Sequence, residues 1–286
     1  MKHLPWVLLL LVVGADASST KEAKKGFVEL QATIARLRSE SGADAKQVLE
    51  LFAREFQRSD LEKKPFLAEL QEAKPGKVDA TGSRALVRFT VPGEESSPVR
   101  AVLLENERGV WRLACARSFI VDGKGLRDAR GRKPARARMS MRTTNGPYGS
   151  SAYSFTYVSG DMRKYKNRVD IWFCHNQDFH VRGGVVDLGK KSLGTVKKIP
   201  LDASWRRVAR AEAGHTYVMR VGPNERRDFF VAFQVTRLKR GVAELSWTLL
   251  AGGHGAPSTI HKPNPLPESD RRDGADGVDG LPGKRG

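Results

Sequence analysis

The chain has 286 residues, of which 40% are hydrophobic and 29% charged, with two cysteines and a formal net charge of +18. This apolar fraction is too high for a wholly disordered chain, and two cysteines are too few for a disulfide-stapled scaffold. Beyond the N-terminus, no apolar run approaches the roughly 20 residues that cross a bilayer, so we expect no integral membrane span in the mature chain. The length suffices for two ordinary domains, and the composition predicts a basic globular protein.

Residues 1–17 have the layout of a secretory signal peptide. Lys2 and His3 precede an apolar stretch over residues 5–14, and residues 15–17 (Ala-Asp-Ala) supply the small-x-small pattern of a cleavage site. The alternative is a buried helix at the start of a cytosolic domain. We expect export, and therefore a secreted protein or one of the periplasm or cell envelope.

Residues 18–122 change from helical to alternating patterning. An apolar stripe at helical spacing runs through 27–37, and shorter stripes follow within 48–56 and 66–70. From Val87 onward, apolar and polar residues alternate as they do in strands. Helices followed by an antiparallel meander predict an α+β domain in which the helices cover one face of the sheet.

The later strands of this segment, VRAVLLENERGVWRLA, resemble those of the nuclear-transport-factor-2-like superfamily of small cone-shaped domains. The superfamily includes enzymes as well as ligand-binding and scaffolding domains, so the resemblance implies a fold and no function. Its catalytic members place Asp/His or Tyr/Asp sets inside the cone. This segment has no His, and we expect no catalysis in it because the positions predicted to face inward are apolar: Val87, Phe89, Val91, Trp111, Leu113 and Cys115.

The segment 123–147 concentrates positive charge. Residues 123–142 hold eight Lys/Arg against one acidic residue and show no apolar periodicity, which is typical of an exposed linker. The linker is either a solvated spacer or an arm that binds anionic polymers. Nucleic acid fits the charge equally well, but export favours an anionic polysaccharide or another envelope polyanion. The residues expected to bind it are Arg127, Arg130, Arg132, Lys133, Arg136 and Arg138.

Residues 148–250 alternate almost throughout. Apolar stripes of period two, such as 229–235 and 245–249, are separated by glycine-containing turns at 182–184 and 213–215. We therefore predict an all-β sandwich or open barrel.

Part of this second segment resembles a β-module found in exported bacterial proteins. The shared features are Asp-Leu-Gly at 187–189, Trp205 before a strand, and Gly-His-x-Tyr at 214–217. The resemblance implies no particular chemistry. We expect Gly214 to permit a tight turn in which His215 bonds the backbone.

Candidate chemical groups are few. His175, Asp178 and His180 would approach one another if 176–178 formed a turn, but no second pair with ligand spacing accompanies them, so we expect no metal ion or other cofactor. Cys174 and His175 are adjacent, and in a regular strand they would point to opposite faces and could not act as a nucleophile and its base.

Cys115 and Cys174 both lie in alternating segments. They are either two buried thiols or one disulfide that joins the two folded parts in an oxidising compartment.

The C-terminal region has two parts. Residues 251–273 are rich in Pro and Gly and predict an extended linker. In 274–286, Gly occupies every third position, which resembles the collagen-like repeats of bacterial surface proteins. Four triplets are too few for a stable triple helix alone, so the segment is either a disordered tail or an element that assembles a trimer together with the folded parts.

The sequence thus favours an exported, non-enzymatic protein for binding, adhesion or assembly that engages anionic polymers. Two alternatives stay open. One is a metal-dependent hydrolase that uses His175, Asp178 and His180. The other is a structural oligomer assembled through the collagen-like tail.

Overall fold

The computed structural model describes residues 17–39, 45–54, 57, 64–93, 99–115, 117–123, 126, 133–141, 151–160, 169–174, 176–222 and 227–262. Residue contacts divide the chain into two compact units, Met1–Ser118 and Phe119–Gly286, here called unit 1 and unit 2. The predicted signal peptide, up to residue 16, and the collagen-like segment 274–286 lie outside the described residues.

Unit 1 begins with the helices α1 (Ala17–Ser39), α2 (Ala45–Glu50) and α3 (Lys64–Glu72). The helical stripe predicted over 27–37 is confirmed, since Phe27, Leu30, Ile34 and Leu37 are all buried on one side of α1. The Gln31 amide donates hydrogen bonds of 2.8 and 2.7 Å to two carbonyls at the end of α3, which tie the two helices together. Within the described residues, no helix is long and apolar enough to cross a membrane.

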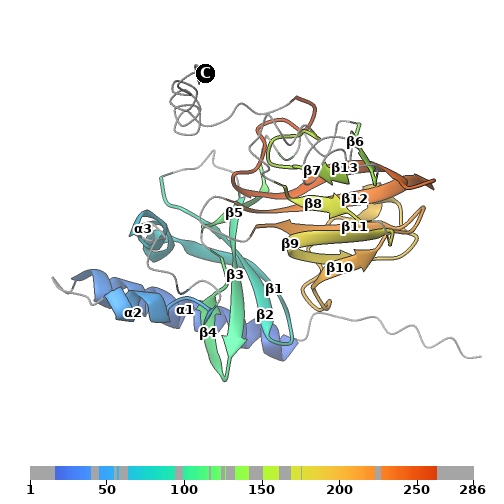
Figure 1. Cartoon of the computed structure of the whole chain (residues 1–286). Coiled ribbons are helices and arrows are strands. Elements are labelled where there is room, and N and C mark those ends of the chain that lie inside the picture. The colour runs from blue at the N-terminus through green and yellow to red at the C-terminus, as the bar shows by residue number, and fades with distance from the viewer. Residues whose placement is uncertain are drawn as a thin grey trace, which may run out of the picture. The chain divides into compact units, whose positions relative to one another are not determined.

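The strands of unit 1 form an antiparallel meander: β1 (Lys74–Thr81), β2 (Arg84–Thr90), β3 (Val99–Glu107) and β4 (Val110–Leu113). Helix α1 packs against β1, β2 and β4 (Figure 1). The approach is close, because a Cβ built on Gly26 would lie 2.3 Å from the Trp111 ring. Helices followed by antiparallel strands are the α+β arrangement that the sequence predicts.

Unit 2 consists of β5 (Phe119–Asp122), β6 (Ala135–Ser140), β7 (Ala152–Tyr153), β8 (Ile171–Phe173), β9 (Asp178–Asp187), β10 (Arg206–Arg210), β11 (Thr216–Val221), β12 (Asp228–Lys239) and β13 (Val242–His254). The order β13-β12-β11-β9-β8-β7 forms the main path, all antiparallel, and β10 pairs with β9. The two strands nearest to unit 1 in sequence, β5 and β6, pair with the last strand, β13. A 3₁₀ turn spans Leu193–Thr195.

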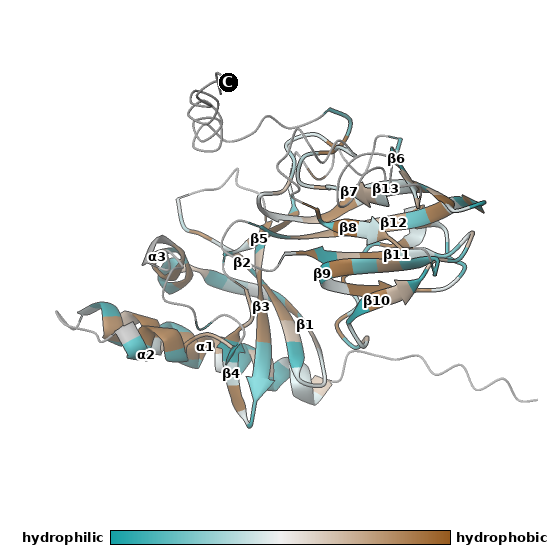
Figure 2. Ribbon diagram, viewed as in Figure 1, coloured by the Kyte–Doolittle hydropathy of each residue, from teal (hydrophilic) through white to brown (hydrophobic). Residues whose placement is uncertain are grey.

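The main apolar core of unit 2 lies against one face of these strands, as the alternation of apolar and polar residues along them requires. Figure 2 shows hydrophobic and hydrophilic residues interleaved along the strands. Aromatic rings pack against one another in it. The ring centroids of Phe155 and Trp247 lie 5.0 Å apart, and Tyr217 stacks on Phe233 with ring centroids 5.0 Å apart. The sheet curls round this core, because β6, at one end of the strand order, contacts β7 and β8 at the other.

Gly183 marks the closest approach of backbone in unit 2. A Cβ at this position would lie 2.0 Å from the Arg220 carbonyl oxygen and 2.4 Å from that of Gly222. Only glycine fits so near a neighbouring strand. The turn predicted at 182–184 is therefore wrong, since these residues lie inside β9 and its glycines serve packing instead.

The boundaries of the predicted linkers also change. Residues 135–140 of the expected basic linker form β6, and 251–254 of the expected Pro-rich linker complete β13. Beyond β13, Ile260 is only 2% exposed and belongs to the core of unit 2. Residues 119–122, assigned from the sequence to the first domain, form β5 in unit 2. The alternation in 135–140 was hidden because two of its three inward residues are alanines, which give a weak apolar signal.

Candidate functional site

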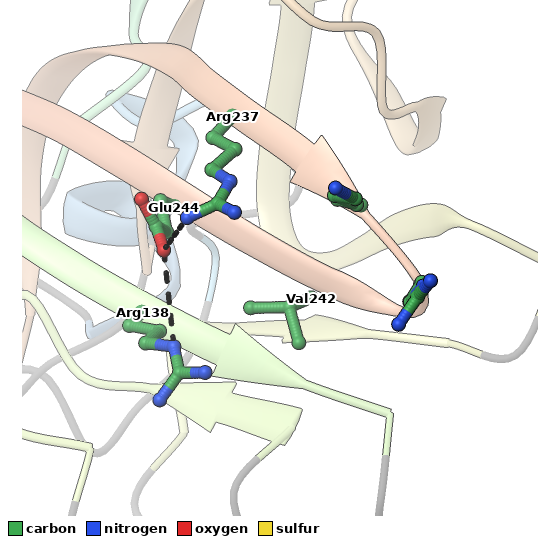
Figure 3. Close-up of a pocket in the computed structure, with 6 residues that line it drawn as sticks. Arg138, Arg237, Val242 and Glu244 are labelled. Atoms are coloured by element: carbon green, nitrogen blue, oxygen red, sulfur yellow. Dashed lines mark ion pairs between the residues drawn. The ribbon is translucent and has the colours of Figure 1, made fainter.

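A shallow depression of about 250 Å³ lies on the outer face of unit 2, beside the hairpin that joins β12 to β13 (Figure 3). Four of its six lining side chains are cationic, one is acidic and one is apolar. We call this set the basic patch: Arg138, Arg237, Lys239, Arg240, Val242 and Glu244.

Strand register brings these residues together. Glu244 in β13 is the direct cross-strand neighbour of Arg138 in β6 on one side and of Arg237 in β12 on the other. Cross-strand neighbours on one face of a sheet are close enough for their side chains to interact. The next outward residue of β13, Val242, lies opposite Lys239, so cations from two strands and a turn surround one carboxylate.

The ion pairs inside the patch are loose. Glu244 Oε1 lies 3.5 Å from Arg237 Nη1 and 4.0 Å from Arg138 Nε (Figure 3). The Arg138 and Arg237 side chains remain 71% and 61% exposed. Such pairs contribute about 1 kcal/mol or less to stability, so the arginines are not fixed by them.

The patch has a net charge of +3, because four cations surround a single carboxylate. Within the part of the chain that the structure describes, neither Lys239 nor Arg240 forms an ion pair. Arg240 occupies the first position of a two-residue turn with φ of 48°, followed by Gly241 with φ of 75°. Positive φ at both positions defines a type I′ hairpin, in which Arg240 extends from the tip of the sheet.

The six residues predicted to bind polyanions have different outcomes. Arg138 lies in the basic patch. Arg136, on the same strand and the same outward face, is exposed opposite Ser246, and Lys133 is exposed just before β6. Arg127, Arg130 and Arg132 lie outside the described residues.

Sequence reasoning missed three of the four cations of the patch: Arg237, Lys239 and Arg240. The signal was present as three cations in four positions directly before Gly241. Their link to 136–138 could not be seen, because it depends on both segments pairing with β13.

The candidate metal ligands do not assemble a site in the described residues, which contain no group of three potential ligands. Asp178 lies 3.6 Å from the Arg210 guanidinium and accepts a hydrogen bond from Asn176. His180 stacks on Trp172 with ring centroids 5.6 Å apart. His175 lies outside the described residues.

The two cysteines are thiols, and no disulfide joins them. Cys115 is buried, with its Sγ 3.7 Å from the Leu103 carbonyl oxygen. Partial burial raises the pKa of the Cys174 thiol, which lowers its thiolate fraction and argues against a nucleophile.

Two of the three motifs compared with a β-module lie side by side, since Tyr217 is the cross-strand neighbour of Asp187, whereas Trp205 lies apart from them, against Gly184 and Phe230. His215 lies between two carboxylates, with Nδ1 3.0 Å from Asp187 and Nε2 3.2 Å from Glu212, rather than bonding the backbone through its ring as expected. The Tyr217 hydroxyl donates to the Arg210 carbonyl at 2.7 Å and accepts from the Glu212 amide at 3.0 Å. The turn at 213–215 is confirmed, with Gly214 at φ of 82°. His215 and Tyr217 thus connect the start of β11 to the ends of β9 and β10.

Comparison of this chain with protein-family models, with curated proteins and with solved structures finds no match.

Proposed function

We propose that the protein is an exported, non-enzymatic binding protein whose unit 2 holds an anionic polysaccharide on the basic patch. The observation that carries the proposal is the excess of exposed cations: four of them line a depression with one carboxylate, and the two that contact it do so in loose ion pairs that a ligand can replace.

The shape of the patch supports a polymer as the ligand. A depression of about 250 Å³ on an open face is smaller than the roughly 300–1,000 Å³ of pockets that enclose drug-sized molecules. A chain lying across the face gains contacts beyond the depression, because Arg136 and Lys133 continue the exposed cations along β6. Arginine suits such a site, since its planar fork binds oxyanions at two points and is weakly hydrated.

For the fold, we propose a specific domain type for each unit, beyond the α+β class. Unit 1 would be a nuclear-transport-factor-2-like scaffold domain, and unit 2 a separately folding open barrel, in keeping with its curled sheet and single core. Export would follow from the N-terminal pattern, and the collagen-like segment would assemble trimers. Deleting 274–286 and measuring the mass in solution by sedimentation tests the last point.

Retention on heparin-agarose across a NaCl gradient tests the binding proposal. We expect the triple variant Arg138→Ala, Arg237→Ala, Arg240→Ala to elute at markedly lower salt than the unmodified protein. The slope of log Kd against log salt should shrink by about two to three, because each cation contacting a polyanion releases up to one counterion.

The matched control removes three cations from unit 1: Arg84→Ala, Arg108→Ala, Arg112→Ala. This variant loses the same charge and should elute with the unmodified protein. Equal elution of both triple variants would mean that retention follows net charge only, and would overturn the assignment to the basic patch.

A further inference from the structure

Glu244 occupies the centre of the basic patch, where a bound anion would lie. A single oxygen, Oε1, faces both Arg138 and Arg237, at 4.0 and 3.5 Å (Figure 3). Charge-assisted hydrogen bonds between arginine and a carboxylate are normally about 2.7–2.9 Å long. The Glu244 carboxylate is therefore a poorly fitting anion already present in the site.

A carboxylate ligand gains little from such a site. To reach Arg138 and Arg237 it must displace Glu244, and it then makes contacts of the kind that Glu244 made before. The displaced carboxylate stays tethered beside the ligand on β13 and repels it, since like charges in close contact are unfavourable. Glu244 thus lowers the affinity for carboxylate ligands in two ways: it already occupies the arginines, and it repels the ligand once displaced.

A tetrahedral oxyanion differs in geometry. A sulfate or phosphate ester presents terminal oxygens in several directions, whereas the two oxygens of a carboxylate lie in one plane. The cations of the patch come from β6, from β12 and from the hairpin turn, so they surround the depression instead of facing it from one side. A tetrahedral group can contact Arg138 and Arg237 and still offer an oxygen to Lys239 or Arg240.

We infer that the basic patch selects polymers bearing sulfate or phosphate esters over polymers bearing only carboxylates, and that Glu244 is the residue that determines this specificity. The inference rests on the proposed function, because it concerns the ligand class of the same site.

Competition against immobilised heparin tests the inference with the full chain. The competitors are dextran sulfate, polyphosphate, polygalacturonate and uncharged dextran, compared at equal concentrations of charged groups. We expect dextran sulfate or polyphosphate to release the protein at an about tenfold lower concentration than polygalacturonate, which is the value of one additional charge-assisted hydrogen bond. The stronger of the two identifies the tetrahedral oxyanion, sulfate or phosphate, that the site prefers.

The variant Glu244→Gln separates specificity from charge. It keeps the size of the side chain and removes its charge. Polygalacturonate should therefore release the protein at an about tenfold lower concentration than before, and the preference for esters over carboxylates should shrink to about threefold or less. The matched control is Glu105→Gln in unit 1, whose carboxylate likewise lies 3.6 Å from one guanidinium, that of Arg84. This control should leave the preference unchanged.

The outcomes are distinct. An equal improvement for every polyanion in Glu244→Gln would show a simple charge effect and would overturn the inference while leaving polyanion binding intact. Equal competition by esters and carboxylates in the unmodified protein would also overturn it. No binding to heparin at all would overturn the proposed function together with the inference.

Discussion

Two hairpins of the protein have the same turn sequence and similar positive φ values but differ in the balance of charge around the turn. In unit 1, β3 and β4 are joined by Arg108-Gly109 with φ of 56° and 88°. In unit 2, β12 and β13 are joined by Arg240-Gly241 with φ of 48° and 75°. Both are two-residue turns with positive φ, in which Asn-Gly is the preferred sequence and an arginine is unusual.

The residues beside the two turns differ. Next to Arg108, Glu107 pairs with Arg112 at 3.5 Å, and Glu105 pairs with Arg84 at 3.6 Å, so each of these two neighbouring arginines has its own carboxylate. Next to Arg240, one carboxylate serves two arginines. An arginine at a turn therefore does not by itself indicate a binding site. The two hairpins differ in how many carboxylates neutralise the cations beside the turn.

The largest effect is expected where a cation of unit 2 supports the fold instead of facing solvent. Arg220 makes two 2.8 Å hydrogen bonds to Asp228, which is 1% exposed, and its guanidinium lies within 6 Å of the Phe119 and Phe230 rings. Asp228→Ala leaves a buried guanidinium without this carboxylate and should lower the free energy of unfolding by about 3–5 kcal/mol in urea denaturation.

Replacing both partners tests the same point. Arg220→Met with Asp228→Leu should recover most of the loss, since no buried charge then remains. A loss of less than about 1 kcal/mol for Asp228→Ala would mean that this buried pair contributes no more to stability than an exposed ion pair, and would contradict the prediction.

Alkaline pH should act on unit 2 before unit 1. All five tyrosines of the sequence lie after residue 118. Burial raises the pKa of Tyr153 to about 12 and also raises the pKa of Tyr217. A group with a raised pKa in the folded state gives stability that is complete below its unfolded value near pH 10 and is lost as the pH rises towards the folded value.

Tyrosinate absorbance at 295 nm measures this directly. We expect the signal of Tyr153 and Tyr217 to appear only near pH 12 or above, together with loss of unit 2 structure. A single transition near pH 10 that accounts for all five tyrosines would contradict the prediction.

The two hairpin arginines should respond alike in stability and differently in binding. Asn is preferred over Arg at positive φ in such turns, so Arg108→Asn and Arg240→Asn should each stabilise the protein by about 0.5–1 kcal/mol. Only Arg240→Asn should elute earlier from heparin. Equal shifts in elution for both variants would remove the distinction between the hairpins.

The smallest effect is expected at the exposed pairs of unit 1. Arg84→Ala breaks a pair of 3.6 Å with Glu105 whose side chains are about a third exposed, and it should cost less than about 1 kcal/mol. Its heparin elution should not change. A cost of 2 kcal/mol or more in thermal or urea unfolding would show that charge pairing holds unit 1 together, which the geometry does not suggest.

The parts of the fold that sequence predicts well are those whose pattern is long and local. The stripe through 27–37 is a helix of 23 residues with all four predicted residues buried, because the period of 3.6 is repeated over several turns. The strands around 229–235 and 245–249 are likewise found where alternation is strong.

The errors have specific causes. Gly183 and Gly184 suggest a turn from composition alone. A glycine inside a strand also permits the close approach of neighbouring backbone or side chains, and the local sequence does not distinguish a turn from such a strand. Residues 135–140 present alanines inward and arginines outward, so their charge masks a strand. Of the four cations in the basic patch, local charge predicts only Arg138. Its grouping with the other three depends on register between segments far apart in the chain, which no local pattern shows.

The pairing of β6 with β13 sets the order in which the molecule can be completed during synthesis. Residues 242–247 must emerge before β6 has a partner, whereas each strand of unit 1 finds its neighbour within the next few dozen residues. Contacts of such long sequence separation form slowly. Until then, no strand holds Arg138 beside Arg237. The basic patch therefore forms only after β13 has been synthesised and has paired with both β6 and β12.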